Sequence, residues 1–309
     1  MNAARALDSH AINQADPSVL AAELRRILAG PPAQAAATLR AAAEGGVVQA
    51  QLVYGQWLLD GRGVACDPAQ AVQWFEHASR HGDPMALNML GQCHAHGWGV
   101  ARNPFMAAYW FRLAAIGGLD WGMYNYATAL ALGQGIPTDR TAALGWFHRA
   151  AELGHAKSLN MIGSFHEDGW VVDQDENQAL GWYRRAAEGG DFRGQFNTAR
   201  LLLARGRIEE AAPWLERVPD SATPAFLRQA ADWLQSWLAS RPPPASLPPG
   251  MEVAARLIPL IRHFRQHPGS PAPGAALEES MVQPRGDRPP RHPTAQASPA
   301  TPSTTLPPC

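Results

Sequence analysis

Four tryptophans recur at a fixed interval, and this interval constrains the fold more than any other feature. They lie 36 residues apart: Trp74, Trp110, Trp146 and Trp182. An aromatic residue follows each of them, at Phe75, Phe111, Phe147 and Tyr183. Further columns keep the same interval: Ala71, Ala107, Ala143 and Ala179; Ala78, Ala114, Ala150 and Ala186; Gly46, Gly82, Gly118, Gly154 and Gly190. Several columns in one register indicate tandem copies of one structural unit.

Each copy contains a segment that reads as an amphipathic helix. In the first copy Asp67 precedes Pro68, which suits an N-cap followed by proline at the first helical position. The N-cap column is Asp67, Asn103, Asp139 and Asp175. Ala71, Trp74, Phe75 and Ala78 then follow the i, i+3, i+4, i+7 spacing of one helical face. We expect this face to be buried, and the glycine that ends each copy to be a left-handed C-cap.

A second helix precedes this one in each copy. It carries small residues in two columns, Ala50, Ala86, Gly122, Ser158 and Gly194, and Gly55, Gly91, Ala127, Gly163 and Ala199. A glycine inside a helix costs about 1 kcal/mol relative to alanine, so its recurrence indicates close approach of the tryptophan-bearing helix. The connecting turns contain two glycines, as at Gly61 and Gly63, except that Val171 replaces the second in the fourth copy. A β-branched residue disfavours positive φ, so a rearranged turn is expected there.

These residues resemble the Sel1-like repeat family, which is related to the tetratricopeptide repeat. The matching features are the small-residue helix, the Gly-x-Gly-Val turn and the Ala-x-x-Trp-aromatic helix that ends in glycine. Residues 43–218 give four clear copies (about 43–78, 79–114, 115–150 and 151–186) and a shortened fifth from residue 187. The resemblance implies an all-α fold, a right-handed α/α superhelix of helix-turn-helix repeats, and a role in scaffolding protein complexes.

The regions outside the array are predicted from composition. Residues 1–16 are expected to be disordered, 17–45 to form a degenerate helix pair that caps the array, and 219–240 to form a capping helix, because solenoids need atypical ends. Residues 241–309 hold 17 of the 27 prolines, which predicts a disordered tail. Within it, residues 251–266 form an amphipathic helix containing Pro259. That helix docks on the solenoid, serves as a partner-binding motif, or touches a membrane surface.

Composition excludes several classes of protein. The net charge of −1 provides no basic field for phosphate, so nucleic acid is not an expected partner. No apolar stretch approaches the length of a membrane span. The three cysteines form no C-x-x-C pair, and the N-terminus lacks the apolar core of a signal peptide, so a cytoplasmic location is predicted. The oligomeric state does not follow from the sequence.

No catalytic constellation is apparent, so we predict neither an enzyme nor a cofactor. Gly-x-Ser-x-Gly, Ser-x-x-Lys and phosphate-loop motifs are missing. His77 and His81 have the i, i+4 spacing that binds zinc in some helices. The column of His77 is otherwise Leu113, Arg149 and Arg185, and no further ligand has a recognisable spacing, so we predict no metal site.

A second periodicity suggests where a partner binds. The second and fourth copies resemble each other: Leu87 to His94 parallels Leu159 to His166, and both continue to a Gly-Trp turn. A past two-unit duplication, with histidine filling the usual tyrosine position, accounts for this. Alternatively, five side chains project into the concave groove and contact a peptide: Asn88, His94, Tyr124, Asn160 and His166. The family usually lines its concave side with the first helix of each repeat.

The sequence therefore predicts an interaction scaffold or adaptor that holds a peptide or partner protein in the groove. Two alternatives are kept. Some secreted, cysteine-rich members of the family bind or hydrolyse β-lactams, but they carry a cysteine pair in each repeat, which this chain does not. The other alternative is a structural component of an envelope or secretion assembly, with the tail as a tether.

Overall fold

The computed structural model describes residues 26–240 and 249–266, with side chains from 257 in the second range, and shows no strand within them. The chain divides into two compact units at Trp146 and Phe147, and each is described by itself. Residues 1–16, the first part of the expected helix pair at 17–45, and residues 241–248 and 267–309 of the proline-rich tail lie outside the described residues. The described helices follow one another as antiparallel pairs, which is the architecture of an α-solenoid.

The first unit contains α3 and the helix pairs of the first repeats. The bounds are α3 (Pro32–Glu44), α4 (Val48–Asp60), α5 (Pro68–Ser79), α6 (Pro84–His96), α7 (Pro104–Ile116) and α8 (Asp120–Leu132). Consecutive helices from α3 to α8 pack on each other. Helix α9 (Arg140–Glu152) begins in this unit and ends in the next.

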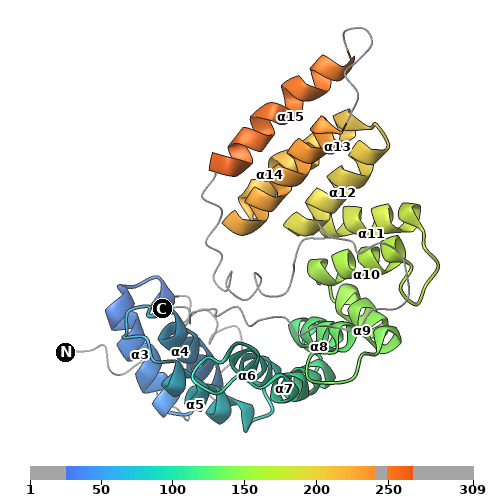
Figure 1. Ribbon diagram of the computed structural model, residues 1–309. Coiled ribbons are helices and arrows are strands. Elements are labelled where there is room, and N and C mark those ends of the chain that lie inside the picture. The colour runs from blue at the N-terminus through green and yellow to red at the C-terminus, as the bar shows by residue number, and fades with distance from the viewer. Residues whose placement is uncertain (1–25, 241–248, 267–309) are drawn as a thin grey trace. The chain divides into compact units, whose positions relative to one another are not determined.

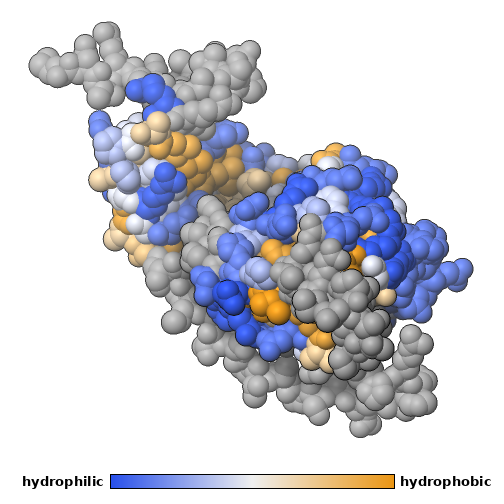
Figure 2. All heavy atoms as spheres, turned by 90° about the horizontal axis from the view of Figure 1, so that it is seen from above, coloured by the Kyte–Doolittle hydropathy of each residue, from blue (hydrophilic) through white to orange (hydrophobic). Residues whose placement is uncertain are grey.

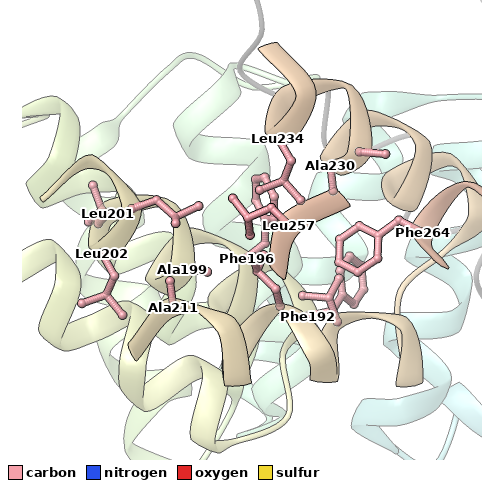
Figure 3. Close-up of a cluster of buried hydrophobic side chains, with 14 of the residues drawn as sticks. Phe192, Phe196, Ala199, Leu201, Leu202, Ala211, Ala230, Leu234, Leu257 and Phe264 are labelled. Carbon is pink, nitrogen blue, oxygen red and sulfur yellow. The ribbon is translucent and has the colours of Figure 1, made fainter. Parts of the chain in front are cut away.

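The second unit continues the pairs and ends in three further elements after the fifth repeat. The bounds are α10 (Ala156–Asp168), α11 (Glu176–Glu188), α12 (Phe192–Ala204), α13 (Ile208–Arg217), the short η1 (Val218–Asp220), α14 (Pro224–Ala239) and α15 (Pro249–Gln266). Helix α15 packs on α13 and α14 (Figure 1). Leu257 and Phe264 of α15 lie in one apolar cluster with Phe192 and Leu234 (Figure 3).

The predicted caps are confirmed. Asp67 accepts a hydrogen bond from the backbone N–H of Gln70 at 2.9 Å, and Asn103, Asp139 and Asp175 accept equivalent bonds three residues on. The glycines that end the copies, Gly46, Gly82, Gly118, Gly154 and Gly190, have φ between 71° and 87°. Local sequence therefore sets where these helices begin and end.

The buried stripe differs from the prediction in one column. Ala71, Phe75 and Ala78 are fully buried, but Trp74 is only half-buried, and so are the other three tryptophans of its column. The close approach expected at the helix glycines is made by the phenylalanine instead: a Cβ on Gly91 would lie 2.5 Å from the ring of Phe111. The aromatic residue after each tryptophan therefore fills the core.

The turn of the fourth repeat also differs from the prediction. We expected a rearranged turn at Val171, but its φ is 55°, close to the 68° of Gly63 and the 65° of Gly99. The left-handed conformation is retained at the cost of strain in a β-branched residue. In the earlier turns, a Cβ on Gly63 or Gly99 would lie 2.1–2.2 Å from a proline carbonyl oxygen, so glycine is required there. The Val171 side chain is exposed.

Candidate partner-binding surface

The five residues predicted to contact a partner lie on the first helices of three repeats. Asn88 and His94 are on α6, and Tyr124 is on α8, all in the first unit. Asn160 and His166 are on α10 in the second unit. The structure therefore brings them together as two separate groups, one in each unit.

The two asparagines are buried and bond to the next repeat. The side-chain N–H of Asn125 donates to Oδ1 of Asn88 at 2.8 Å, and the side-chain N–H of Asn197 donates to Oδ1 of Asn160 at 2.9 Å. Asn88 is 5% exposed and Asn160 is 6% exposed. A buried carboxamide needs such a partner, because an unpaired one is costly. Each pair fixes the register between the first helices of adjacent repeats.

This pairing supplies a structural reason for the resemblance between the second and fourth copies. The partners are 37 residues apart in both pairs, so the donor always lies one residue later in the following copy. At the equivalent positions of the first and second copies stand Leu52 and Met89. The polar pair of the later copies therefore stands where the first and second copies carry apolar residues.

Tyr124 is also buried, at 7% exposure. Its ring lies edge-on to Trp121 at 6.3 Å between centroids, and its carbonyl accepts a hydrogen bond from Thr128. The side chain is therefore held within α8 and its surroundings.

The two histidines are half-buried, and each has a buried Nδ1 with no hydrogen-bond partner. His166 stacks on Trp182, with the ring planes 11° apart. That histidine fills the family's usual tyrosine position stays a prediction; in the other copies of this chain, the position of His94 and His166 is held by Leu58 and Leu130. Tyrosines 54 and 126 lie one helical turn earlier, edge-on to Trp74 and Trp146. The tyrosine and histidine positions are four residues apart and share a helix face, so a ring at either position can contact the tryptophan of the following helix.

A buried polar network in the second unit was missed by the sequence analysis. The Tyr183 hydroxyl of α11 donates to Oε2 of Glu167 on α10 at 2.7 Å. Nη2 of Arg200 on α12 donates to the same oxygen at 2.6 Å. Ser164 lies 3.2 Å from the hydroxyl, and Nε of Arg200 points to Oδ1 of Asn197 at 3.4 Å. The network therefore joins three helices and reaches the Asn160–Asn197 pair.

The electrostatics of this network follow from burial and from the ion pair. Burial and the adjacent Glu167 carboxylate raise the pKa of Tyr183, so the hydroxyl stays protonated and donates. Burial opposes the charge of Arg200, but the hydrogen bond and the charge of Glu167 together raise its pKa. The Glu167 side chain is 8% exposed and that of Arg200 is 23% exposed. The guanidinium is thus held by Glu167, and the Arg200 side chain as a whole keeps part of its exposure.

Two departures from the columns are the signals that could have revealed this network. Glu167 stands in a column of Leu59, Ala95 and Ala131, and Tyr183 in a column of phenylalanines. Each departure places one polar group in an otherwise apolar position. Buried polar groups are hydrogen-bonded, so two such departures in one repeat predict that they meet.

The histidine pair considered as a metal site does not form one in the described residues. His77 and His81 are both exposed. Within the part of the chain that the structure describes, no group of three or more His, Cys, Asp or Glu side chains is placed to hold a metal ion. Among these same residues, no helix is long and apolar enough to cross a membrane. On the face in view in Figure 2, apolar residues form a few groups among polar ones.

Known proteins share this architecture. The Sel1 repeat model matches residues 48–83, 84–119, 122–155 and 156–191. A Sel1 repeat protein from Oxalobacter formigenes is 24% identical, with a TM-score of 0.60 over 76% of this chain and 100% of that chain. A protective antigen of uropathogenic Escherichia coli with an SLR fold is 23% identical, with a TM-score of 0.55 over 82% of this chain and 54% of that chain.

No curated protein matches this sequence. At these identities the two solved structures establish the fold alone. The consecutive helix pairs, their glycine and aromatic columns and the four matched repeats show that the chain belongs to the Sel1-like repeat family, whose members generally mediate protein–protein interaction.

Proposed function

We propose that this chain is a non-catalytic scaffold that binds a partner protein or peptide along the first helices of its repeats. The observation that carries the proposal is the oriented guanidinium of Arg200, held by Glu167 at 2.6 Å while its side chain remains 23% exposed. A pre-oriented arginine loses little side-chain entropy on binding and matches carboxylates and carbonyls.

Neighbouring groups extend the surface around Arg200. Asn197 on the same helix is half-buried and donates to Asn160, and His166 stacks on Trp182. Carboxamides and aromatic rings recur in protein interfaces because they combine hydrogen bonding with apolar contact. The Glu167–Arg200 pair is costly to keep, since the buried carboxylate of Glu167 loses its water. Recognition by Arg200 offers a reason for its presence.

In the first unit, the equivalent surface is carried by α6 and α8. His94 keeps a buried Nδ1 without a hydrogen-bond partner, and Asn88 is engaged with Asn125. We propose that the ring of His94 contacts the partner and that Asn88 and Tyr124 shape the surface from beneath. The cytoplasmic location and the exclusion of nucleic acid remain predictions from the sequence.

The test uses substitutions that the repeat itself provides. His94→Leu and His166→Leu restore the residue found at Leu58 and Leu130. Asn160→Leu with Asn197→Met copies the Leu52 and Met89 pair. Arg200→Lys keeps the charge but loses the planar fork. Circular dichroism and thermal melts establish that each variant is folded.

Each full-length variant is tagged and used to isolate proteins from cell lysate for mass spectrometry. We expect a reproducible partner of the unmodified chain to be lost from Arg200→Lys and from the two His→Leu changes. Arg149→Ala, on the exposed surface of α9, is the control and should retain it. Retention of every reproducible partner by all of the folded variants would contradict binding along the first helices.

A further inference from the structure

The outer face of α7 exposes large apolar side chains. Phe105 is 62% exposed, Tyr109 is 45% exposed and Ile116 is 61% exposed. Their spacing of four and seven residues places them on one face of the helix. The opposite face, with Ala107, Phe111 and Ala114, is buried in the first unit. Helix α7 is therefore apolar on both sides, although only one side is covered.

The repeat itself does not require these residues. At the position of Phe105, other copies have Ala69, Thr141 and Asn177; at that of Tyr109, Gln73, Gly145 and Gly181; at that of Ile116, Arg80, Glu152 and Glu188. The outer faces of the other second helices are thus small or polar. Clustered exposed aromatic and aliphatic side chains on a single helix mark an interaction surface, whereas isolated ones do not.

One unpaired charge lies within this apolar face. Arg112 is exposed, three residues after Tyr109 and four before Ile116, so it shares their side of the helix. It is the only charged residue in α7. Arg112 forms no ion pair or hydrogen bond with any described residue. The face therefore presents an apolar stripe with one free cation.

The end of α7 lies beside the start of α6. Gly117 follows Ile116, and a Cβ at Gly117 would lie 2.9 Å from Cγ of Pro84, which precedes the exposed Met85. Exposed apolar side chains are thus found on both helices at this point of the first unit. From Phe105 to Ile116 the stripe covers eleven helical steps, which is about 16 Å at 1.5 Å per residue.

We propose that this outer face of α7 binds an amphipathic helix of a partner protein, with a carboxylate of that helix against Arg112. A stripe of three helical turns matches the apolar face of one packed helix, since helices pack through side chains at i, i+3 and i+4. Aromatic residues and arginine are the residue types enriched in interface cores. This surface is distinct from the first-helix surface and does not depend on it.

The test is a selection from a display library of 18-residue helical peptides against the full-length chain. The reference variant carries Phe105→Thr, Tyr109→Gln and Ile116→Glu, which are the residues at Thr141, Gln73 and Glu152. Because these residues occur on the other second helices, the variant should fold, and circular dichroism checks this. We expect enriched peptides with apolar residues at i, i+4 and i+7 and an acidic residue among them. They should bind the reference variant at least tenfold more weakly.

Charge reversal tests the role of Arg112 directly. Arg112→Glu should weaken the selected acidic peptides at least tenfold, and replacing their acidic residue by lysine should restore binding to this variant. Peptides that bind the chain and the reference variant equally would overturn the proposal. So would α7-dependent peptides that lack an acidic residue and ignore Arg112→Glu. Sedimentation velocity tests whether a second copy of the chain occupies the α7 face. A dimer of the unmodified chain that dissociates in the reference variant would also overturn the proposal.

Discussion

The second and fourth repeats have the same fold and different interiors. In the second repeat, Gly91 of α6 lies against Phe111 of α7, whose ring carries no hydroxyl. In the fourth, Gly163 of α10 lies against Tyr183 of α11, whose hydroxyl bonds to Glu167 and is joined through it to Arg200. One backbone arrangement therefore accommodates either a phenylalanine or a tyrosine whose hydroxyl joins a polar network.

The difference shows that the distance between the two helices of a repeat and the polarity of their contact are determined by different residues. The glycine and the ring fix how closely the two helices approach, and they do so in both repeats. The hydroxyl, the carboxylate and the guanidinium are added without changing that approach. Since a buried ion pair seldom adds stability over apolar packing, its presence in one repeat points to a task other than stability.

Breaking the ion pair on one side should give the largest effect. Glu167→Ala leaves Arg200 and the Tyr183 hydroxyl without their acceptor, and we expect a loss of about 3 kcal/mol in the free energy of unfolding. Urea denaturation measures it. The triple change Glu167→Ala, Tyr183→Phe and Arg200→Thr installs the residues found at Ala95, Phe111 and Thr128 and should recover most of the loss. If the single change is neutral, the network is solvated and the contrast between the repeats disappears.

The close contact between glycine and aromatic ring, which both repeats share, predicts the second-largest effect on stability. Gly163→Ala places a Cβ 2.7 Å from the ring of Tyr183, so we expect a loss of about 2 kcal/mol from overpacking. Gly181→Ala is the matched control, because that helical glycine has open space around it. The control should gain up to about 1 kcal/mol from helix propensity. Equal effects of the two changes in thermal unfolding would show that the close approach is relaxed.

A pH dependence should distinguish the second repeat, where His96 stands at the position of Asp168. Burial and the charge of Arg102 lower the pKa of His96 to about 4. The folded state then stays neutral while the unfolded state takes up a proton below about pH 6.5, so stability is lost as the pH falls from 6.5 towards 4.

His96→Leu should remove this contribution, which is on the order of 1–2 kcal/mol. Leucine is the residue at Leu132, so the packing is native-like. The measurement is the difference in unfolding free energy between the two proteins at pH 7 and at pH 4.5. A difference that does not change with pH would mean that His96 is charged in the folded state.

The smallest effect concerns the turns. Val171 has a φ of 55° where Gly99 has 65°, so Val171→Gly should relieve backbone strain and stabilise the protein by about 1 kcal/mol. Val172→Gly, on the neighbouring residue, should destabilise it and serves as the control. A loss of stability in Val171→Gly, measured by chemical denaturation, would indicate that the valine side chain contributes packing that outweighs its strain.

Much of the fold could be predicted from the sequence, and particular residues show where prediction stops. The N-cap at Asp67 and the left-handed glycine at Gly82 are local signals, and both are confirmed. The burial of Trp74 was overestimated, because i, i+3, i+4 spacing does not say which of two adjacent aromatics faces the neighbouring helix. Val171 was expected to rearrange its turn, but the turn keeps the left-handed conformation of the glycine-containing turns.

Less of the candidate partner-binding surface could be predicted from the sequence. Asn88 and Asn160 were predicted to face a partner, but both are buried and bond to Asn125 and Asn197, which no local pattern indicates. Glu167 and Arg200 are 33 residues apart and lie on different helices, so no local pattern joins them. The apolar face of α7 is defined by exposure, 62% at Phe105, and the repeat spacing alone does not distinguish an exposed residue from a buried one.

The sequence by itself determined the repeat, its period, most helix ends and the residues that recur in the core. Those features depend on the backbone and on nearest neighbours along one chain segment. Only the tertiary structure decided which side chains from different helices meet, where α15 docks, and which apolar face stays uncovered. Such contacts depend on the positions of several helices at once, and a one-dimensional period does not contain that information.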